Sequence, residues 1–193
     1  SGSSSSGSST TDTSNGTVVT SFSELTAAVT KAEKAGGGIV YVKGSSISCT
    51  AQLALKASNA NVSIIGVKNS DGTYPVLDFS AFRSAYIGKA TTDSEVGIRI
   101  SGSNYTIKNL IIQKAPDNGI QIKGSSAGNN TIENCMVRYN NDAGVQITGG
   151  AYSNTMRFVY SYRNCDVYTL GGNADGFAPK LGAGKGNVFY GCY

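Results

Sequence analysis

Apolar and polar residues alternate along most of the chain, with one exception near the start. The stretches "GIVYVKG", "VSIIGV" and "PVLDF" have the period of two and the β-branched residues that are typical of strands. In residues 21–35, by contrast, apolar residues fall at helical spacing, Ser21 and Glu24 form a capping box, and Gly36 follows. The pattern predicts one amphipathic helix followed by many short strands.

The alternating pattern repeats from residue 97 onward. One series of motifs reads "GIRI", "GIQI", "GVQI" and "GFAP", beginning at Gly97, Gly119, Gly144 and Gly176. A second series reads "NYTI", "NNTI", "SNTM" and "GNVF", beginning at Asn104, Asn129, Ser153 and Gly186. A period of roughly 25 residues with strands and no helices indicates stacked units, so an all-β parallel β-helix is expected.

Equivalent positions of successive coils should then stack along the helix axis. We expect two inward columns, Ile98–Ile120–Val145–Phe177 and Ile100–Ile122–Ile147–Pro179, and between them an outward row of Arg99, Gln121, Gln146 and Ala178. The amphipathic helix is expected to cover the open N-terminal end, because exposed strand edges promote aggregation. The last stretch, "NVFYGCY", has no such cap, so the β-helix is expected to be incomplete at its C-terminal end.

Composition narrows the possible classes of protein. Histidine is absent, which excludes Ser-His-Asp and Cys-His catalysis and His-ligated zinc. The net charge of +4 favours an anionic partner, but no basic cluster or motif indicates nucleic acid, and the charge also suits an ordinary solvated surface. No apolar run is long enough to span a membrane.

The beginning of the chain is polar and of low complexity. Residues 1–16 are rich in Ser, Gly and Thr and are expected to form a flexible linker, which leaves residues 17–193 as one β-helix domain. Such tracts commonly join modules of secreted polysaccharide-processing proteins. We therefore expect a modular, secreted, extracellular protein.

The repeat places no two of the four cysteines close enough to predict a disulfide. Cys135 and Cys192 fall in one column two coils apart, a separation of roughly 9.6 Å. A disulfide tolerates Cα atoms only to about 7 Å, so this pair should stay unbridged and pack as small apolar residues. Cys49 and Cys165 have no assignable partner.

Two long motifs carry a specific resemblance. The segment "GGNADGFAPKLGAGKGNVFYGCY" from Gly171 resembles part of polysaccharide lyase family 9, and "ENCMVRYNNDAGVQITGGAYSNT" from Glu133 is similar to the preceding coil of that family. The resemblance covers residues 97–193. It implies a right-handed parallel β-helix and a pectate lyase that cleaves polygalacturonate, the acidic polysaccharide of pectin, by calcium-dependent β-elimination.

The resemblance also implies a role for Asp175, which matches the calcium-binding Asp of the family's NADGF motif. In the family the other calcium ligands and the base lysine follow this segment, so we expect no catalytic residue within these 193 residues. Calcium takes about 6–8 oxygen ligands, and the acids near Asp175 are few: Asp117, Asp142 and Asp166. Each of these suits ordinary turn chemistry as well as an approach to the site.

The family pattern is not matched everywhere. Pro179 and Gly182 stand where the family has Cys and His, which alters the local backbone and any polar contact there.

Lysines are the candidates for contact with an acidic polysaccharide. Lys180 continues an outward row of Ser101, Lys123 and Thr148, and Lys185 follows in the next turn. Lys123, Lys180 and Lys185 are predicted to bind substrate, although surface lysines often serve only solubility. Neither Lys180 nor Lys185 has a neighbour in the sequence that would make it a general base. A noncatalytic pectin-binding or structural β-helix remains the alternative.

Overall fold

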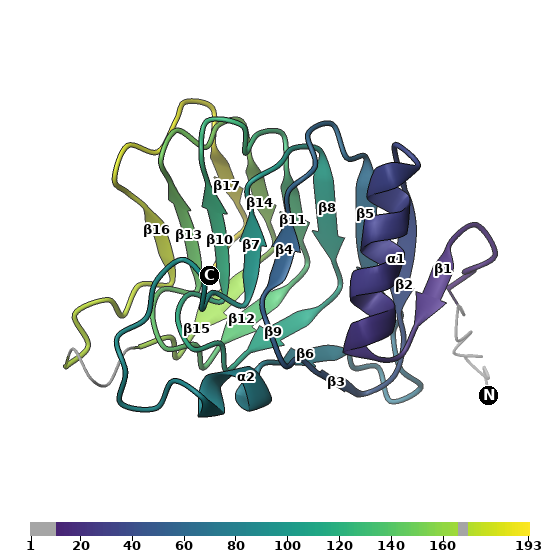
Figure 1. The fold of residues 1–193 in the computed structure, drawn as a ribbon, viewed down its shortest axis with the longest axis horizontal. Helices are drawn as coiled ribbons and strands as arrows, with labels where there is room; N and C mark the ends of the chain where they lie inside the picture. The colour runs from purple at the N-terminus through teal and green to yellow at the C-terminus, as the bar shows by residue number, and fades with distance from the viewer. Residues whose placement is uncertain (1–10, 166–169) are drawn as a thin grey trace, which may run out of the picture.

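The alternating segments form short parallel strands that stack into three sheets (Figure 1). A computed structural model describes residues 11–165 and 170–193. The first sheet consists, in spatial order, of β1 (Thr17–Val19), β2 (Gly38–Val42), β5 (Val62–Gly66), β8 (Tyr105–Lys108), β11 (Thr131–Glu133), β14 (Thr155–Arg157) and β17 (Val188–Tyr190). The second consists of β4 (Leu53–Leu55), β7 (Ile98–Ile100), β10 (Ile120–Lys123), β13 (Val145–Thr148) and β16 (Phe177–Pro179). The third consists of β3 (Ser46–Ser48), β6 (Val76–Asp78), β9 (Ile111–Gln113), β12 (Met136–Arg138) and β15 (Tyr160–Tyr162).

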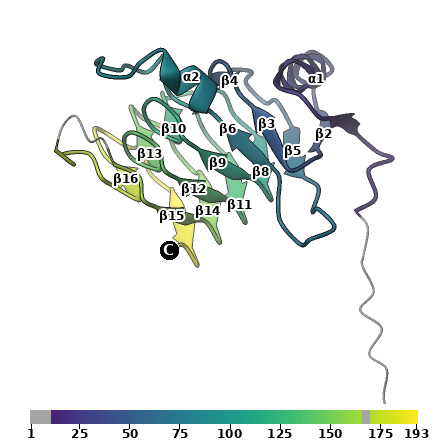
Figure 2. The same cartoon turned by 90° about the horizontal axis from the view of Figure 1, so that it is seen from below.

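The order of the strands confirms a parallel β-helix. Each coil gives one strand to each sheet, and strands of successive coils lie side by side between α1 (Phe22–Lys34) at one end and β15, β16 and β17 at the other (Figure 2). The stacking begins before the sequence repeat does, because β2 already pairs with β5 and β3 with β6. Coils therefore precede residue 97, where side-chain repetition first becomes visible.

The register of the second sheet confirms the predicted inward columns up to β13. At the open end of the stack the burial differs from the prediction: Phe177 is half-buried and Pro179 is exposed, whereas Ala178, which was expected to face outward, is buried. Ile120 pairs with Ile98 on one side and with Val145 on the other, and Val145 pairs with Phe177. The isoleucines and Val145 are fully buried. Burial of each such side chain stabilises the fold by about 1.5–3 kcal/mol, so the apolar columns are the main source of cohesion between coils.

The second motif series marks a corner of each coil. Asn104, Asn129, Ser153 and Gly186 occupy equivalent positions and all have positive φ, between 52° and 77°. Asn and Gly tolerate this left-handed conformation best, which explains their recurrence. The residue after this corner is an inward asparagine in three coils, Asn130, Asn154 and Asn187, whose side-chain amides bond to one another.

The helix α1 covers the N-terminal end of the stack, as predicted (Figure 1). Its N-cap is Ser21, whose side chain accepts from the N–H of Glu24, while the Glu24 side chain accepts from the N–H of Ser21. Leu25, Ala28 and Val29 are buried on its inner face against β1, β2 and β5. The other described helix is the short α2 (Ser80–Ser84), and no helix of the described part of the chain has the length and apolarity to span a membrane.

The opposite end of the stack exposes apolar side chains. Phe189 of β17 is 37% exposed and Val188 is 49% exposed. Phe177 contacts Phe189 edge to face at 5.4 Å, and both line a shallow surface with Cys192 and Tyr193. No described helix covers this end as α1 covers the other.

All four cysteines are free thiols, so the prediction that Cys135 and Cys192 stay unbridged is confirmed. Cys49 and Cys135 are buried, whereas Cys165 and Cys192 are partly exposed. The predicted linker lies mostly in residues 1–10, outside the described residues, and the first strand begins at Thr17.

Candidate functional site

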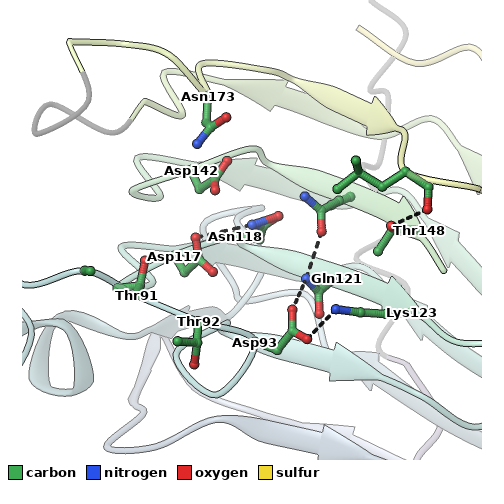
Figure 3. Close-up of a pocket in the computed structure, with 13 residues that line it drawn as sticks. Thr91, Thr92, Asp93, Asp117, Asn118, Gln121, Lys123, Asp142, Thr148 and Asn173 are labelled. Carbon is green, nitrogen blue, oxygen red and sulfur yellow. Dashed lines mark hydrogen bonds and ion pairs between the residues drawn. The ribbon is translucent and has the colours of Figure 1, made fainter.

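A polar pocket of about 390 Å³ lies against the outward face of the second sheet (Figure 3). One wall is the segment 90–93, which precedes β7, and the others are the turns that lead into β10, β13 and β16. Its lining includes the side chains of Thr92, Asp93, Asp117, Asn118, Gln121, Lys123, Asp142, Gln146, Thr148 and Asn173. The pocket thus gathers residues from at least three coils, because equivalent turns stack at one edge of the sheet.

Two residues of the outward row that was predicted from the sequence, Gln121 and Gln146, line this pocket. Gln121 pairs in register with Arg99 and Gln146, as expected. The side chains do not face open solvent, however, since Gln121 is 3% and Gln146 is 8% exposed. The segment 90–93 lies against this part of the sheet. The alternation of apolar and polar residues within the strands does not predict that a loop packs there.

Asp93 fixes that segment to the sheet. Its carboxylate lies 2.5 Å from Lys123 Nζ and 3.1 Å from Arg99 Nη1, and it accepts from Gln121 Nε2 at 2.9 Å. Partial burial raises the pKa of Asp93, but the hydrogen bonds from Lys123, Gln121 and Arg99 outweigh it and lower the pKa to about 2. Asp93 is therefore ionised at neutral pH and neutralises the lysine of the pocket.

Asp117 and Asp142 occupy the same position on consecutive coils. Ile120 pairs with Val145, so the residues three positions earlier, Asp117 and Asp142, lie one above the other (Figure 3). Asp117 is 8% exposed. Burial, followed by the hydrogen-bonding contact with Asp142 and its charge, raises the pKa of Asp117 to about 7.

Two amide oxygens of the pocket lining have no hydrogen-bond partner. They are Asn118 Oδ1 and Gln121 Oε1. The amide nitrogen of Gln121 donates to Asp93 and to Gln146 Oε1, and that of Asn118 approaches Asp117 at 3.4 Å. The pocket lining thus contains two buried acceptors without a donor.

Asp175 lies at the next coil, at the entry to β16. Its backbone oxygen accepts from the N–H of Gly144, which places it level with Ala143 and, one coil further, with Asn118. Its side chain is half-exposed and lies 3.4 Å from Lys180 Nζ. Asp117 and Asp142 are therefore offset by one residue from Asp175 and do not form a column with it. Asp166 lies outside the described residues.

The predicted lysines are separated by this geometry. Lys123 pairs in register with Thr148 and lines the pocket. Lys180 lies two coils from Lys123, beside Asp175, and its backbone N–H donates to Ile147 of the coil between them. Lys185 is exposed in the turn between β16 and β17, outside the pocket. The three lysines do not converge on one point.

The described residues do not by themselves make the calcium site that the resemblance implies around Asp175. Calcium takes about 6–8 oxygen ligands. Within residues 11–165 and 170–193, no group of three or more His, Cys, Asp or Glu side chains is placed to hold a metal, and Asp175 faces a lysine. Any such site needs ligands from outside these residues.

Sequence reasoning found Lys123, Asp117, Asp142 and Asp175 but missed several members of the pocket. Asp93 and its segment carry no repeat and no motif, so nothing in the sequence placed them over β7 and β10. Asn173 sits beside Asp142 in the pocket lining (Figure 3). It belongs to the NADGF motif, which would have been a usable signal.

Comparisons with known proteins agree with this architecture. Residues 6–193 match the family described as Pel9A-like, right-handed β-helix region. Pectate lyase L of Paenibacillus polymyxa (strain SC2) is 33% identical over 166 residues, which cover 82% of this chain and 35% of that protein.

Two solved structures are also similar. The crystal structure of pectate lyase Pel9A matches with a TM-score of 0.67 and 27% identity over 89% of this chain and 41% of that one. A rhamnogalacturonan lyase, at 21% identity and a TM-score of 0.61 over 81% and 43% of the two chains, shares the fold. The chain spans about a third of the length of the pectate lyase L that it matches. The family match extends over nearly the whole sequence, and the chain belongs to the Pel9A-like right-handed β-helix family.

Proposed function

We propose that this chain forms the N-terminal coils of a secreted pectate lyase-type enzyme that degrades polygalacturonate by calcium-dependent β-elimination. The observation that carries the proposal is the family match over residues 6–193, together with 33% identity to a pectate lyase. In β-elimination a base removes the proton next to the uronate carboxylate, and a cation at that carboxylate makes the proton more acidic.

We further propose that Asp175 contributes one carboxylate to the calcium site of the whole enzyme. Two observations support this role: Asp175 lies half-exposed at the end of a sheet edge, and the Asn173 of the same motif points into the polar pocket. A cation bound at Asp175 would compete with Lys180 for the same carboxylate. The remaining ligands and the base are proposed to lie outside these 193 residues, because the described part holds no suitable cluster.

Lys180 and Lys185 are proposed to attract the uronate carboxylates of the substrate. Lys185 is exposed, and Lys180 is one third exposed beside Asp175. Lys123 was predicted to share this role, but its ammonium group is held by Asp93 at 2.5 Å, so a uronate would have to displace that carboxylate. We therefore propose that Lys123 serves mainly to fix the segment 90–93.

The test uses the protein as its complete gene encodes it. Incubation with polygalacturonate and calcium should produce the ultraviolet absorbance of an unsaturated product, and chelation should abolish it. Asp175→Asn should lower the rate by about 100-fold, whereas Asp71→Asn, in an exposed turn, should leave it unchanged.

Two results would change the proposal. Binding of polygalacturonate without unsaturated product would favour the noncatalytic pectin-binding module. Activity on rhamnogalacturonan alone would change the substrate but keep the lyase class.

A further inference from the structure

Tyr139 lies against two arginines on the outside of the third sheet. Its ring centroid is 5.7 Å from the guanidinium carbon of Arg138 and 5.7 Å from that of Arg163. Arg163 Nη1 donates to the Tyr139 hydroxyl at 2.9 Å, and Arg138 Nη1 donates to the Tyr162 hydroxyl at 3.1 Å. The two tyrosine rings meet edge to face at 6.2 Å. These four residues belong to the adjacent coils of β12 and β15 (Figure 2), and we call them the arginine–tyrosine cluster.

The positive charge of the arginine–tyrosine cluster is not neutralised within the described residues. No ion pair joins Arg138 or Arg163 to a carboxylate of residues 11–165 and 170–193, whereas Arg157 of the first sheet pairs with Glu133 at 2.7 Å. The Nη2 atoms of Arg138 and Arg163 donate no hydrogen bond to the described residues either. Two guanidinium groups beside one ring repel each other, so an anion between them would be stabilised.

The backbone under the arginine–tyrosine cluster adopts a conformation that its side chains do not favour. Lys114, Tyr139 and Arg163 occupy equivalent positions directly after β9, β12 and β15, with φ between 54° and 60°. The corner before β8, β11, β14 and β17 has Asn, Ser or Gly in this conformation, as sterics favour. Burial does not explain the large residues, because Tyr139 is 38% exposed and Arg163 is exposed. Strained positions with exposed side chains suggest a function.

The arginine–tyrosine cluster lies close to the turn that carries Asp175. That turn begins after Arg163 and ends at β16. Its two ends meet, because Ser161 of β15 donates from Oγ to the carbonyl oxygen of Gly176 at 2.6 Å. Ser161 directly precedes Tyr162, and Gly176 directly follows Asp175. A polyuronate carries a carboxylate on every sugar, so a chain bound at Asp175 brings further carboxylates to the neighbouring surface.

We propose that the arginine–tyrosine cluster is a second binding site for polygalacturonate, apart from the reacting sugar. Arg138 and Arg163 bind the carboxylate of one uronate, because the planar guanidinium group matches a carboxylate with two parallel hydrogen bonds. The exposed ring of Tyr139 contacts the apolar C–H groups of the same sugar. The inference rests on the proposed function for the identity of the polysaccharide, but binding at this site requires neither calcium nor catalysis.

The test is affinity electrophoresis of the 193-residue chain in gels that contain polygalacturonate and a chelator, so that calcium does not contribute. The double variant Arg138→Gln, Arg163→Gln should bind about 5-fold or more weakly, and Tyr139→Ala about 3-fold. Arg163→Gln alone, at an exposed position, should give part of this loss without risk to folding. Methyl-esterified polygalacturonate, which lacks the carboxylate charge, should not distinguish the double variant from the unmodified chain.

The matched control removes the same charge elsewhere. Lys34→Gln with Lys43→Gln, both exposed near the opposite end of the β-helix, should change binding by less than about 2-fold. Equal losses in this control and in the arginine variant would overturn the proposal. Binding of single-stranded DNA that exceeds binding of polygalacturonate and is lost in the arginine variant would also overturn it, and would assign the surface to a phosphate backbone.

Kinetics of the protein that the complete gene encodes separate this site from the site of reaction. The arginine variant should raise KM for polygalacturonate by a factor similar to its loss of binding and leave kcat unchanged. A fall in kcat alone would overturn the proposal, because it would place the arginines at the reacting sugar. Arginine-dependent binding without any unsaturated product would support this site and contradict the proposed lyase activity.

Discussion

The side chain of Asn130 donates from Nδ2 to Oδ1 of Asn154 on the next coil at 2.9 Å, and both residues are fully buried. Asn154 Oδ1 also accepts from the backbone N–H of Asn130 at 3.1 Å, and Asn154 Nδ2 donates to Asn187 on the coil beyond. This ladder satisfies backbone groups at the corners, where the strand hydrogen bonds are interrupted. The ladder joins three consecutive coils inside the β-helix, at the corner that precedes β11, β14 and β17.

Asn154→Ala should therefore destabilise the chain strongly. The substitution leaves the buried backbone N–H of Asn130 without an acceptor and removes one of the two hydrogen bonds of its Nδ2, which keeps the bond to the Gly102 carbonyl. These losses cost about 2–4 kcal/mol in the free energy of unfolding. Urea denaturation measures the loss. Asn69→Ala is the control, because the amide of Asn69 bonds to Thr73 in an exposed turn, and it should cost less than about 0.5 kcal/mol. Equal costs for the two variants would contradict a structural role of the ladder.

An exterior ion-pair row predicts a pH dependence of stability. Glu133 bonds to Arg157 at 2.7 Å and to Lys108 at 2.9 Å, and these contacts, Arg157 first, lower the pKa of Glu133 from its ordinary value of 4.5. A lowered carboxyl pKa stabilises the fold above the unfolded pKa, and this contribution is lost as the pH falls through the folded value.

Glu133→Gln should thus cost about 0.5–1 kcal/mol at pH 7, a small value because the partners are largely solvated, and nothing well below pH 4. A double-mutant cycle with Arg157→Gln, followed by urea denaturation at both pH values, isolates the pair. A coupling energy that is unchanged in acid would show that the carboxylate charge is not its source.

The cysteines should divide into two classes of reactivity. Burial, with a smaller effect of Asp78, raises the pKa of the Cys49 thiol to about 12, and burial raises that of Cys135 to about 12. At pH 8 roughly one such thiol in ten thousand is ionised. An aromatic disulfide reagent should titrate two thiols rapidly in the native chain and four after unfolding.

Single replacements assign the reactive thiols. Cys192→Ser should remove one fast thiol, and Cys135→Ser should remove none. Four equally fast thiols in the native chain would contradict the packing of Cys49 and Cys135.

Substitution of the exposed lysines should weaken polysaccharide binding. The double variant Lys180→Gln, Lys185→Gln is expected to bind polygalacturonate about 3- to 10-fold more weakly in affinity electrophoresis, and the difference should shrink at high salt. Lys43→Gln, at the opposite end of the β-helix, is the control. If Lys43→Gln weakened binding to polygalacturonate as much as the double variant, the net charge of the chain and not the position of the lysines would explain the loss.

The regular part of the fold could be predicted because each coil repeats the same pattern of apolar strand positions and corner residues. The spacing of Ile98, Ile120 and Val145 predicts an inward column, and the asparagines and glycines at the corners predict the turns.

Before residue 97 the alternation continues and Asn61, with φ 51°, occupies the corner position of Asn104. Gln52 stands at the position of Gly97, however, so the glycine motif is absent and the stacking was less visible.

The pocket could be predicted only in part. Lys123, Asp117 and Asp142 follow from the repeat, but Asp93 reaches Lys123 from an irregular segment whose path no periodicity describes. The one-residue offset of Asp175 from Asp142 depends on the register of a single turn. Sequence spacing cannot fix that register, because the turns before β13 and β16 differ in length.

The most direct test of the central claim compares two proteins in one assay: the 193-residue chain and the protein that its complete gene encodes. Unsaturated product formed from polygalacturonate is recorded with calcium and after chelation. The account predicts calcium-dependent product from the complete protein, about 100-fold less from its Asp175→Asn variant, and none from the 193-residue chain. Calcium-dependent turnover by the 193-residue chain, or full activity of the Asp175→Asn variant, would contradict it.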